Sequence, residues 1–282
     1  MVKLLRAGVR RYLRSVIWWL SMAASIICGT LFGDMTSRES YAEAYPLLYL
    51  HVIFACLIAL SVGREVSERV IRNKIVAGHT KKSVLLSELI LAVSACLLLT
   101  VLFLIPMGML TVEVYSSVPL GVRMTVLAGI MLASTVCSVI DVLICMLIHN
   151  RAVSAVVCLI LVIGMSLAGT ELYTALSQKE FVRDPVFTYN DKTGALDVTM
   201  KQERNPRYVD GDQRRVYRFI INCIPYGQAE EYAVIVSDYM QKDLPIDDEQ
   251  NADLSYNAYY SAGFMIVLVT VGLLAFRRRD LK

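Results

Sequence analysis

The sequence lacks the motifs by which the common nucleotide-hydrolysing and hydrolytic enzymes are recognised. It contains no G-x-x-x-x-G-K-[ST] loop to hold the phosphates of ATP, no G-x-S-x-G turn to present a nucleophilic serine and no H-E-x-x-H pair to bind zinc. It also has no obvious inverted repeat of broken helices of the kind found in many secondary carriers. The chain is therefore not expected to be an enzyme, and it cannot by itself be the ATPase of a P-loop transporter.

Patterns that bind metal ions are missing as well. The three histidines, His51, His79 and His149, lie far apart in the sequence, and no C-x-x-C pair occurs. Six of the seven cysteines fall inside apolar runs and only Cys223 lies outside them, so one chain cannot build an extracellular disulfide framework. We expect neither a metal site nor a cofactor in this chain.

Charged residues are scarce, at 19% of the chain against about 25% in a typical soluble domain, whereas apolar residues reach 56%. The apolar residues gather in six long runs, and a helix needs roughly 20 such residues to cross a bilayer. The runs cover about residues 16 to 33, 45 to 62, 84 to 110, 119 to 148, 152 to 171 and 256 to 276. The sequence predicts an all-α integral membrane protein with six transmembrane helices.

Lysine and arginine are unevenly distributed between the two sets of short loops. Sixteen of them lie before the first run, between residues 63 and 82, at Arg151 and after the last run, whereas the other side has only Arg38 and Arg123. Short cytoplasmic loops are enriched in basic residues. The asymmetry therefore predicts a multi-pass protein of the plasma membrane with both termini in the cytoplasm.

The N-terminal residues 2 to 14 alternate apolar and basic side chains at helical spacing. This pattern predicts an amphipathic helix at the membrane interface. Its apolar members are Val2, Leu5, Val9 and Leu13, and its basic members are Lys3, Arg6, Arg10 and Arg14. An equally good interpretation is that the arginines only enforce the orientation, and the two do not exclude each other.

The chain divides into three parts. Residues 1–171 contain the interfacial helix, the first five spans and the connector 63–82; residues 172–257 are the one sizeable polar block; and residues 258–282 contain the sixth span and a cytoplasmic tail. Long translocated domains escape the rule for basic residues, so the polar block is expected outside the cell. Its role, as an outer lid or as a docking surface, is left open by the sequence.

The polar block has enough pattern to fold as a small extracellular α+β region between spans five and six. Alternating residues predict a β-hairpin over 186–200, and amphipathic helices are expected at about 212–224, ended by Pro225, and 228–240. The first helix has the apolar face Val216, Phe219, Ile220 and Cys223. The second has the apolar stripe Ala229, Tyr232, Ala233, Val236 and Met240, with Glu230 and Glu231 in its first turn.

A charged segment, residues 63 to 90, lies between the second and third spans. Apolar residues recur in its first half at intervals of three and four, which predicts a helix. The pairs Glu65–Arg69 and Glu68–Arg72 have the i, i+4 spacing that stabilises a helix outside the bilayer. The segment is therefore expected to stay helical in the cytoplasm.

Two residues mark where one helix of this segment ends and the next one begins. Gly78 is suited to end the helix, because glycine tolerates the left-handed conformation, and Thr80 is suited to cap the next one. The phrase around them consists of Glu65, Ile71, Arg72, Asn73, Lys74, Gly78, Thr80 and Lys81. In this phrase the segment resembles the connector between the second and third spans of bacterial ABC-transporter permeases of the second exporter type.

Two further stretches are similar to the same family. Residues 276 to 281 look like its usual end after the sixth span. The order Asn205-Pro206, Tyr208, Gly211, Arg215, Pro225, Gly227 and Gln228 is similar to a stretch in the outer loop of some Gram-positive permeases, several of them linked to antimicrobial-peptide export or immunity. We know of no chemistry that these residues perform, and a structural role is the simpler interpretation.

The resemblance implies a permease subunit of an ATP-driven exporter. The connector would include a coupling helix that docks on a separate ATP-binding subunit, which holds ATP and Mg. The permease would pair with a second copy of itself or with a related permease in the bilayer. The residues expected to couple to that partner are Glu65, Arg69, Val70, Ile71, Arg72, Asn73, Lys74, Ile75, Gly78 and Thr80. Charged substitutions at Ile71 or Ile75 are expected to unseat the partner. No nucleic acid is expected to bind, and the cargo, a peptide, a lipid or a drug, is left open.

Charged residues inside the spans suggest alternatives. Asp141 is the deepest, and an acid within a span usually marks a transport path or a proton relay. It also fits a structural acid that is protonated or hydrogen-bonded to a serine or threonine of another helix. Glu88 is expected near Lys81 and Lys82 at the inner interface. The competing functions are therefore a proton-coupled secondary carrier that uses Asp141 and a non-transporting sensor or anchor protein.

Overall fold

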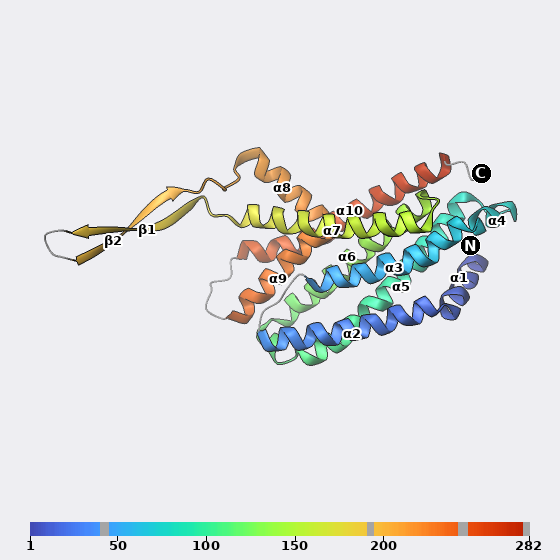
Figure 1. The fold of residues 1–282 in the computed structure, drawn as a ribbon, viewed down its shortest axis with the longest axis horizontal. Coiled ribbons are helices and arrows are strands. Elements are labelled where there is room, and N and C mark those ends of the chain that lie inside the picture. The colour runs from blue at the N-terminus through green and yellow to red at the C-terminus, as the bar shows by residue number, and fades with distance from the viewer. Residues whose placement is uncertain (40–44, 191–194, 242–247, 279–282) are drawn as a thin grey trace.

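The computed structural model describes residues 1–39, 45–190, 195–241 and 248–278, and long helices dominate it (Figure 1). Six of the described helices are long and apolar enough to cross a membrane. They are α2 (Val16–Glu39), α3 (Tyr45–Ser67), α5 (Lys81–Leu110), α6 (Leu120–Leu147), α7 (Arg151–Ser177) and α10 (Asp248–Arg278). The expectation of an all-α membrane protein with six spans is confirmed.

The two ends of the helix bundle carry different elements. One end, called the terminal end from here on, has α1 (Val2–Arg14), α4 (Val70–Val76) and the last turn of α10 (Figure 1). The opposite, distal end has η1 (Val114–Ser117), and the strands β1 (Phe181–Asn190) and β2 (Ala195–Arg204) project beyond it. The described chain therefore begins and ends on one side of the bundle, as an even number of crossings requires.

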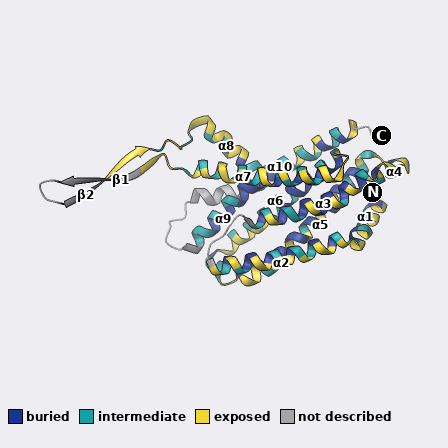
Figure 2. Ribbon diagram, viewed as in Figure 1, coloured by how far each residue is buried: buried dark blue, intermediate teal, exposed yellow. Residues whose placement is uncertain are grey.

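The centre of the bundle is formed by α3, α5 and α6. Figure 2 shows the buried residues concentrated along these helices, and α7 and α10 are the least buried spans. Phe54 and Ile58 of α3, Leu99 of α5 and Val142 of α6 have no measurable exposure to solvent. A polar side chain in this region has to find its partners within the protein, because neither water nor lipid can supply them.

Two glycines let α2 approach α5 closely. A Cβ atom added to Gly29 would lie 2.2 Å from the backbone oxygen of Phe103, and one added to Gly33 would lie 3.0 Å from the Cα atom of Met107. Small residues four apart are typical of close helix contacts in membranes. Because glycine has no side chain, the backbones of α2 and α5 can come close together at these two positions.

Replacing Gly29 should therefore loosen the bundle. We expect Gly29→Leu to lower the free energy of unfolding by about 1–3 kcal/mol, because the clash is with backbone atoms that cannot turn aside. The matched control is Gly164→Leu in α7, where an added Cβ meets nothing within 4 Å. Thermal unfolding of the purified chain in detergent measures both. Equal melting temperatures for the two variants would contradict the close contact.

The predicted β-hairpin is confirmed and is longer than expected. β1 and β2 pair antiparallel from Phe181 opposite Arg204 to Asn190 opposite Ala195, ten residues in each strand. The alternating pattern revealed only the part nearest the turn. The predicted turn at residues 190 to 194 lies almost wholly outside the described residues, apart from Asn190 at the end of β1.

The helical part of the polar block consists of α8 (Gly211–Cys223) and α9 (Pro225–Gln241). The two helices form a hairpin (Figure 1). Ile221 before its turn and Tyr226 after it are both buried. A Cβ atom on Gly169 of α7 would lie 2.9 Å from a backbone nitrogen of α9. Thus α8 and α9 pack against the spans and do not form a separate outer layer.

The buried face of α8 differs from the predicted one. Val216, Phe219 and Ile220 are exposed and Cys223 is half-buried, whereas Ile221 is fully buried. The amphipathic pattern identified an apolar face correctly, but the residue buried most deeply is the one beside it. Ile221 is covered because the tight turn brings it against Gly227 of α9.

The start of α9 also corrects an expectation. Pro225 is the first residue of α9, because its fixed φ suits the first turn of a helix. As a result Glu230 and Glu231 lie beyond the first turn. The predicted apolar stripe is buried at Ala229, Tyr232, Ala233 and Val236, and the side chain of Met240 lies outside the described residues.

The N-terminal helix is present as α1, and a different face packs on the protein. Leu4, Gly8 and Tyr12 are buried, and a Cβ atom on Gly8 would overlap Leu91 of α5. The apolar side chains Val2, Val9 and Leu13 are exposed, while Leu5 is partly buried. The open apolar residues have the character expected of a helix lying in a membrane interface.

Candidate functional site

The predicted continuous helix of the connector is broken. α3 ends at Ser67, and Arg69, with a φ of 60°, precedes α4 in the left-handed conformation. Glu68 pairs with Arg64 at 2.7 Å, so the expected pairs Glu65–Arg69 and Glu68–Arg72 do not form. The break turns α4 back toward the bundle.

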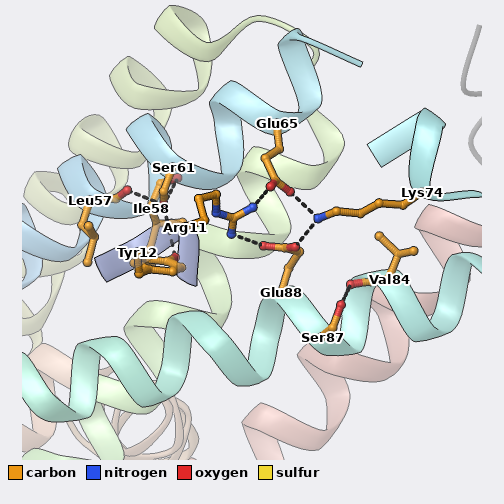
Figure 3. Close-up of polar contacts among 10 residues, drawn as sticks. All are labelled: Arg11, Tyr12, Leu57, Ile58, Ser61, Glu65, Lys74, Val84, Ser87 and Glu88. Carbon is orange, nitrogen blue, oxygen red and sulfur yellow. Dashed lines mark hydrogen bonds and ion pairs between the residues drawn. The ribbon is translucent and has the colours of Figure 1, made fainter. Parts of the chain in front are cut away.

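Four charged side chains meet beneath this turn and form a charge ring (Figure 3). The ring consists of Arg11 of α1, Glu65 of α3, Lys74 of α4 and Glu88 of α5. Lys74 Nζ donates to Glu65 Oε2 at 2.6 Å and to Glu88 Oε1 at 2.8 Å. Arg11 Nη2 donates to Glu88 Oε2 at 3.0 Å, and Arg11 also pairs with Glu65. Each carboxylate bridges both cations, and the ring has no net charge.

The carboxylates are the buried half of the ring. The side chain of Glu88 is 1% exposed and that of Glu65 10%, whereas Lys74 and Arg11 remain 19% and 27% exposed. Removing one partner from a buried ion pair typically costs about 3–5 kcal/mol, because it leaves the other charge uncompensated. The sequence places Glu88 near Lys81 and Lys82, but the cations that it contacts are Lys74 and Arg11, and Lys81 donates to the backbone oxygen of Arg277.

A tyrosine closes the ring on the side of the bundle. Tyr12 lies beside Arg11, and its hydroxyl is 3.2 Å from Ser61 Oγ of α3 (Figure 3). Burial raises the pKa of Tyr12 to about 12, although the hydrogen bond with Ser61 opposes this shift. The tyrosine is therefore neutral at every physiological pH, and it adds a second contact between α1 and α3.

The faces of α4 divide the predicted coupling residues into two groups. Ile71 is only 2% exposed, Ile75 packs partly on the bundle, and Val70 is half-buried. Both isoleucines thus serve the chain's own core, and a charge at either would first disrupt this protein. The expectation that they present an apolar surface to a partner is corrected, because helical periodicity does not reveal which body covers an apolar face.

The outward face of α4 is formed by other residues. Arg72 and Asn73 are exposed, and Val76 is 79% exposed at the end of the helix. Gly78 follows with a φ of 92°, and the Thr80 hydroxyl accepts a hydrogen bond from the Ser83 backbone nitrogen at 3.2 Å. The predicted helix stop and cap are both confirmed.

A second polar cluster lies in the middle of the bundle. His51 of α3 and Asp141 of α6 are fully buried, with His51 Nε2 and Asp141 Oδ2 3.2 Å apart. The other ring nitrogen, Nδ1, is 2.8 Å from the hydroxyl of Tyr226 at the start of α9. A serine or threonine partner was one of the alternatives for Asp141, and the side chain found beside it is a histidine. The cluster joins the α8–α9 hairpin to two central spans.

The cluster contains two buried side chains, His51 and Asp141, that can each carry a proton. The contact between His51 and Asp141 is close, but it lacks the alignment of a hydrogen bond. The pair is neutral overall either as an imidazolium with a carboxylate or as a neutral imidazole with a carboxylic acid, and loss of one proton from either form would leave one negative charge in the core. Among the described residues, no group of three histidine, cysteine, aspartate or glutamate side chains is arranged to hold a metal ion.

Sequence reasoning missed Arg11, His51 and Tyr226. The signal for His51 was a lone histidine in one apolar run and a lone aspartate in another, which become partners only when the two helices meet. Arg11 was one of several N-terminal arginines, and nothing local distinguishes it. Tyr226 follows a proline and resembles an ordinary residue of a turn.

No protein-family model matches the chain, and no curated protein matches it. Its function therefore has to be inferred from its own residues and their contacts.

Proposed function

We propose that the chain is the transmembrane permease subunit of an ATP-driven exporter and that α4 docks on a separate ATP-binding subunit. The observation that carries this proposal is the position of α4. Its outward face has the exposed residues Arg72, Asn73 and Val76, while Lys74 on its inward face enters the charge ring. The helix thus offers one side to a partner and is fastened by the other to the spans.

The charge ring is suited to pass a movement of α4 into the bundle. Lys74 bonds to α3 through Glu65 and to α5 through Glu88, and Arg11 couples the same two carboxylates to α1. A displacement of α4 by a partner would therefore pull on three other helices at once. A transporter needs to bias two conformations by only a few kcal/mol, which packed helix interfaces can provide.

The excess of basic residues at the terminal end supports a cytoplasmic position for α1, α4 and the end of α10 in the plasma membrane. Two permease subunits, identical or related, would then place two copies of α4 beside two ATP-binding subunits. Cargo would leave past α8, α9 and the β-hairpin at the distal end.

The docking face can be tested at Val76. Because Val76 is exposed and not part of the core, Val76→Glu should leave the chain folded and weaken its association with the ATP-binding subunit by about tenfold or more, since an apolar contact would have to bury a charge. Val216→Glu on the exposed face of α8 is the matched control. Co-purification with the ATP-binding subunit encoded nearest to this chain, and ATPase activity of the complex in vesicles, give the readout.

A Val76→Glu chain that bound its partner and stimulated ATP hydrolysis like the natural chain would remove α4 from the mechanism. The same would follow if Val216→Glu were equally harmful.

The buried pair of His51 and Asp141 favours a second candidate, a proton-coupled secondary carrier. A histidine and an aspartate that lie within the spans can bind and release one proton, and such residues often mark a transport path. Transport driven by a proton gradient, without any ATP-binding subunit, would distinguish this candidate from the exporter.

A further inference from the structure

A cavity of about 300 Å³ lies near the distal end of the bundle, between α3, α5, η1, α6 and α9. This volume is at the lower end of the range for small-molecule sites, about 300–1,000 Å³. Its wall is almost entirely apolar and includes Leu50, Phe103, Met107, Ile130 and Val236. The cavity is distinct from both polar clusters, because none of the residues of the charge ring or of the His51 cluster lines it.

The cavity is open along α6. Two residues of this helix, Met124 and Leu127, line the cavity, and both side chains are exposed. Since α6 is a membrane span, this opening faces the hydrocarbon of the bilayer. Leu127 is the eighth residue of the helix, so at 1.5 Å per residue it lies roughly 10 Å from the distal start of the span. A lipid chain in the nearer leaflet can enter sideways without crossing water.

A single cationic side chain lines this cavity. Arg123 is the fourth residue of α6, and among the described residues its guanidinium has no ion-pair or hydrogen-bond partner. An arginine near the end of a span can extend its head to the level of the lipid headgroups. Tyr115 of η1 lies on the same wall and can donate a hydrogen bond there. The polar groups thus gather beside an otherwise apolar space.

We propose that this cavity binds one hydrocarbon chain of an anionic lipid, with the phosphate of its headgroup held by Arg123. A guanidinium binds phosphate through paired hydrogen bonds, which a zwitterionic or cationic headgroup matches less well. A peptide segment is a poorer occupant, because the apolar wall has few partners for its backbone groups. The site does not depend on the proposed transport function, since it requires only a bilayer.

Gly108 provides the first test. It lines the cavity, and a Cβ atom there would meet nothing within 4 Å, so Gly108→Leu fills the space without a clash and strengthens the helix. The probe is hexadecyl phosphate, titrated into the purified full chain in a neutral maltoside detergent and counted by native mass spectrometry. We expect one saturable equivalent with the natural chain and about tenfold weaker binding with Gly108→Leu. Gly164→Leu, the same change in open space on α7, should bind like the natural chain.

Arg123 provides the second test. Hexadecyl phosphocholine, which has the same chain and a zwitterionic head, should bind the natural chain about tenfold more weakly than hexadecyl phosphate, in keeping with a charged hydrogen bond. Arg123→Gln should abolish this preference, and Arg123→Lys should retain part of it. Arg38→Gln, which removes another cation of the distal end, should leave the preference intact. Inorganic phosphate alone should not compete, because it lacks the chain.

The proposal fails if Gly108→Leu binds hexadecyl phosphate as tightly as Gly164→Leu does, or if the natural chain takes both amphiphiles equally. It also fails if inorganic phosphate displaces the probe, because the site would then recognise a free anion. Melting temperatures of all the variants confirm that the comparison is made on folded protein.

Discussion

Lys74→Glu is expected to release α4 from the bundle. The charge ring would then contain three carboxylates and one guanidinium, two of the carboxylates buried, so we expect a loss of about 3–5 kcal/mol in the free energy of unfolding. The amide hydrogens of α4 should exchange faster, and under the proposed function ATP hydrolysis by the partner should no longer drive transport. Thermal unfolding and hydrogen exchange of the purified chain measure the first two effects without any partner.

Two controls isolate the ring from a general effect of charge. Lys74→Arg keeps the cation and should remain close to the natural chain. Arg72→Glu makes the same reversal two residues earlier on the exposed face of α4, and a surface change of this kind usually alters stability by no more than about 0.5 kcal/mol. If Lys74→Glu and Arg72→Glu unfolded at the same temperature, the ring would not hold α4 in place.

Asp141→Leu is expected to have the second large effect. It leaves His51 buried beside an apolar group, and the loss should reach about 3–5 kcal/mol if the pair is charged in the native state. A neutral pair would lose only about 1–3 kcal/mol, the cost of one unsatisfied polar group. Tyr226→Phe, which removes only the hydroxyl bonded to His51, is the smaller reference change at about 1 kcal/mol.

The same residue separates the two candidate functions. With Asp141→Asn, which keeps the shape of the side chain, an ATP-driven exporter should still transport when its partner subunit hydrolyses ATP. A proton-coupled carrier should lose gradient-driven transport completely. Transport by the natural chain and by Asp141→Asn is measured in vesicles, once with ATP alone and once with a proton gradient alone. Transport that needs the gradient and Asp141 but no ATP-binding subunit would overturn the exporter proposal.

The spans, the caps and the β-hairpin could be read from the sequence because each depends on neighbouring residues. A run of apolar residues, the glycine at position 78 and the alternation along β2 act over one turn or one strand. Their physical causes are the same in every protein: the thickness of the hydrocarbon layer sets the length of a span, the left-handed backbone conformation favours glycine, and the pleat of a strand alternates its side chains. The six-span fold therefore followed without any knowledge of how the helices pack.

The charge ring could not be predicted in this way. The local rule paired Glu65 with Arg69, four residues away, whereas its partners are Arg11 and Lys74. A buried carboxylate between two cations is better satisfied than an exposed one beside a single arginine, and that advantage appears only after α1, α3, α4 and α5 have packed. The same reason explains why the burial of Ile71 was not predicted. Its apolar character was clear from the sequence, but it is buried by other parts of the same chain and not by a partner.

The contact between His51 and Asp141 could not be predicted from the sequence for a different reason. The two residues are far apart in the chain, and either one alone fits several explanations. Depth along a helix suggested that Asp141 needed a partner, but not which helix would supply it. Likewise, the amphipathic pattern of α8 did not distinguish a helix in an outer domain from one packed against the spans.

The charge ring also sets an order for the assembly of the protein in the membrane. Arg11 is made early, and Glu88 follows it by 77 residues, so the ring can close only after the first turns of the third span have left the ribosome. Until then Arg11 lacks its contact with Glu88, whereas Lys74 of α4, which is made earlier, can already pair with Glu65. The first three spans must therefore come together as one unit during synthesis. Although α1 is the first helix to reach the membrane, it is among the last parts of that unit to be fixed in place.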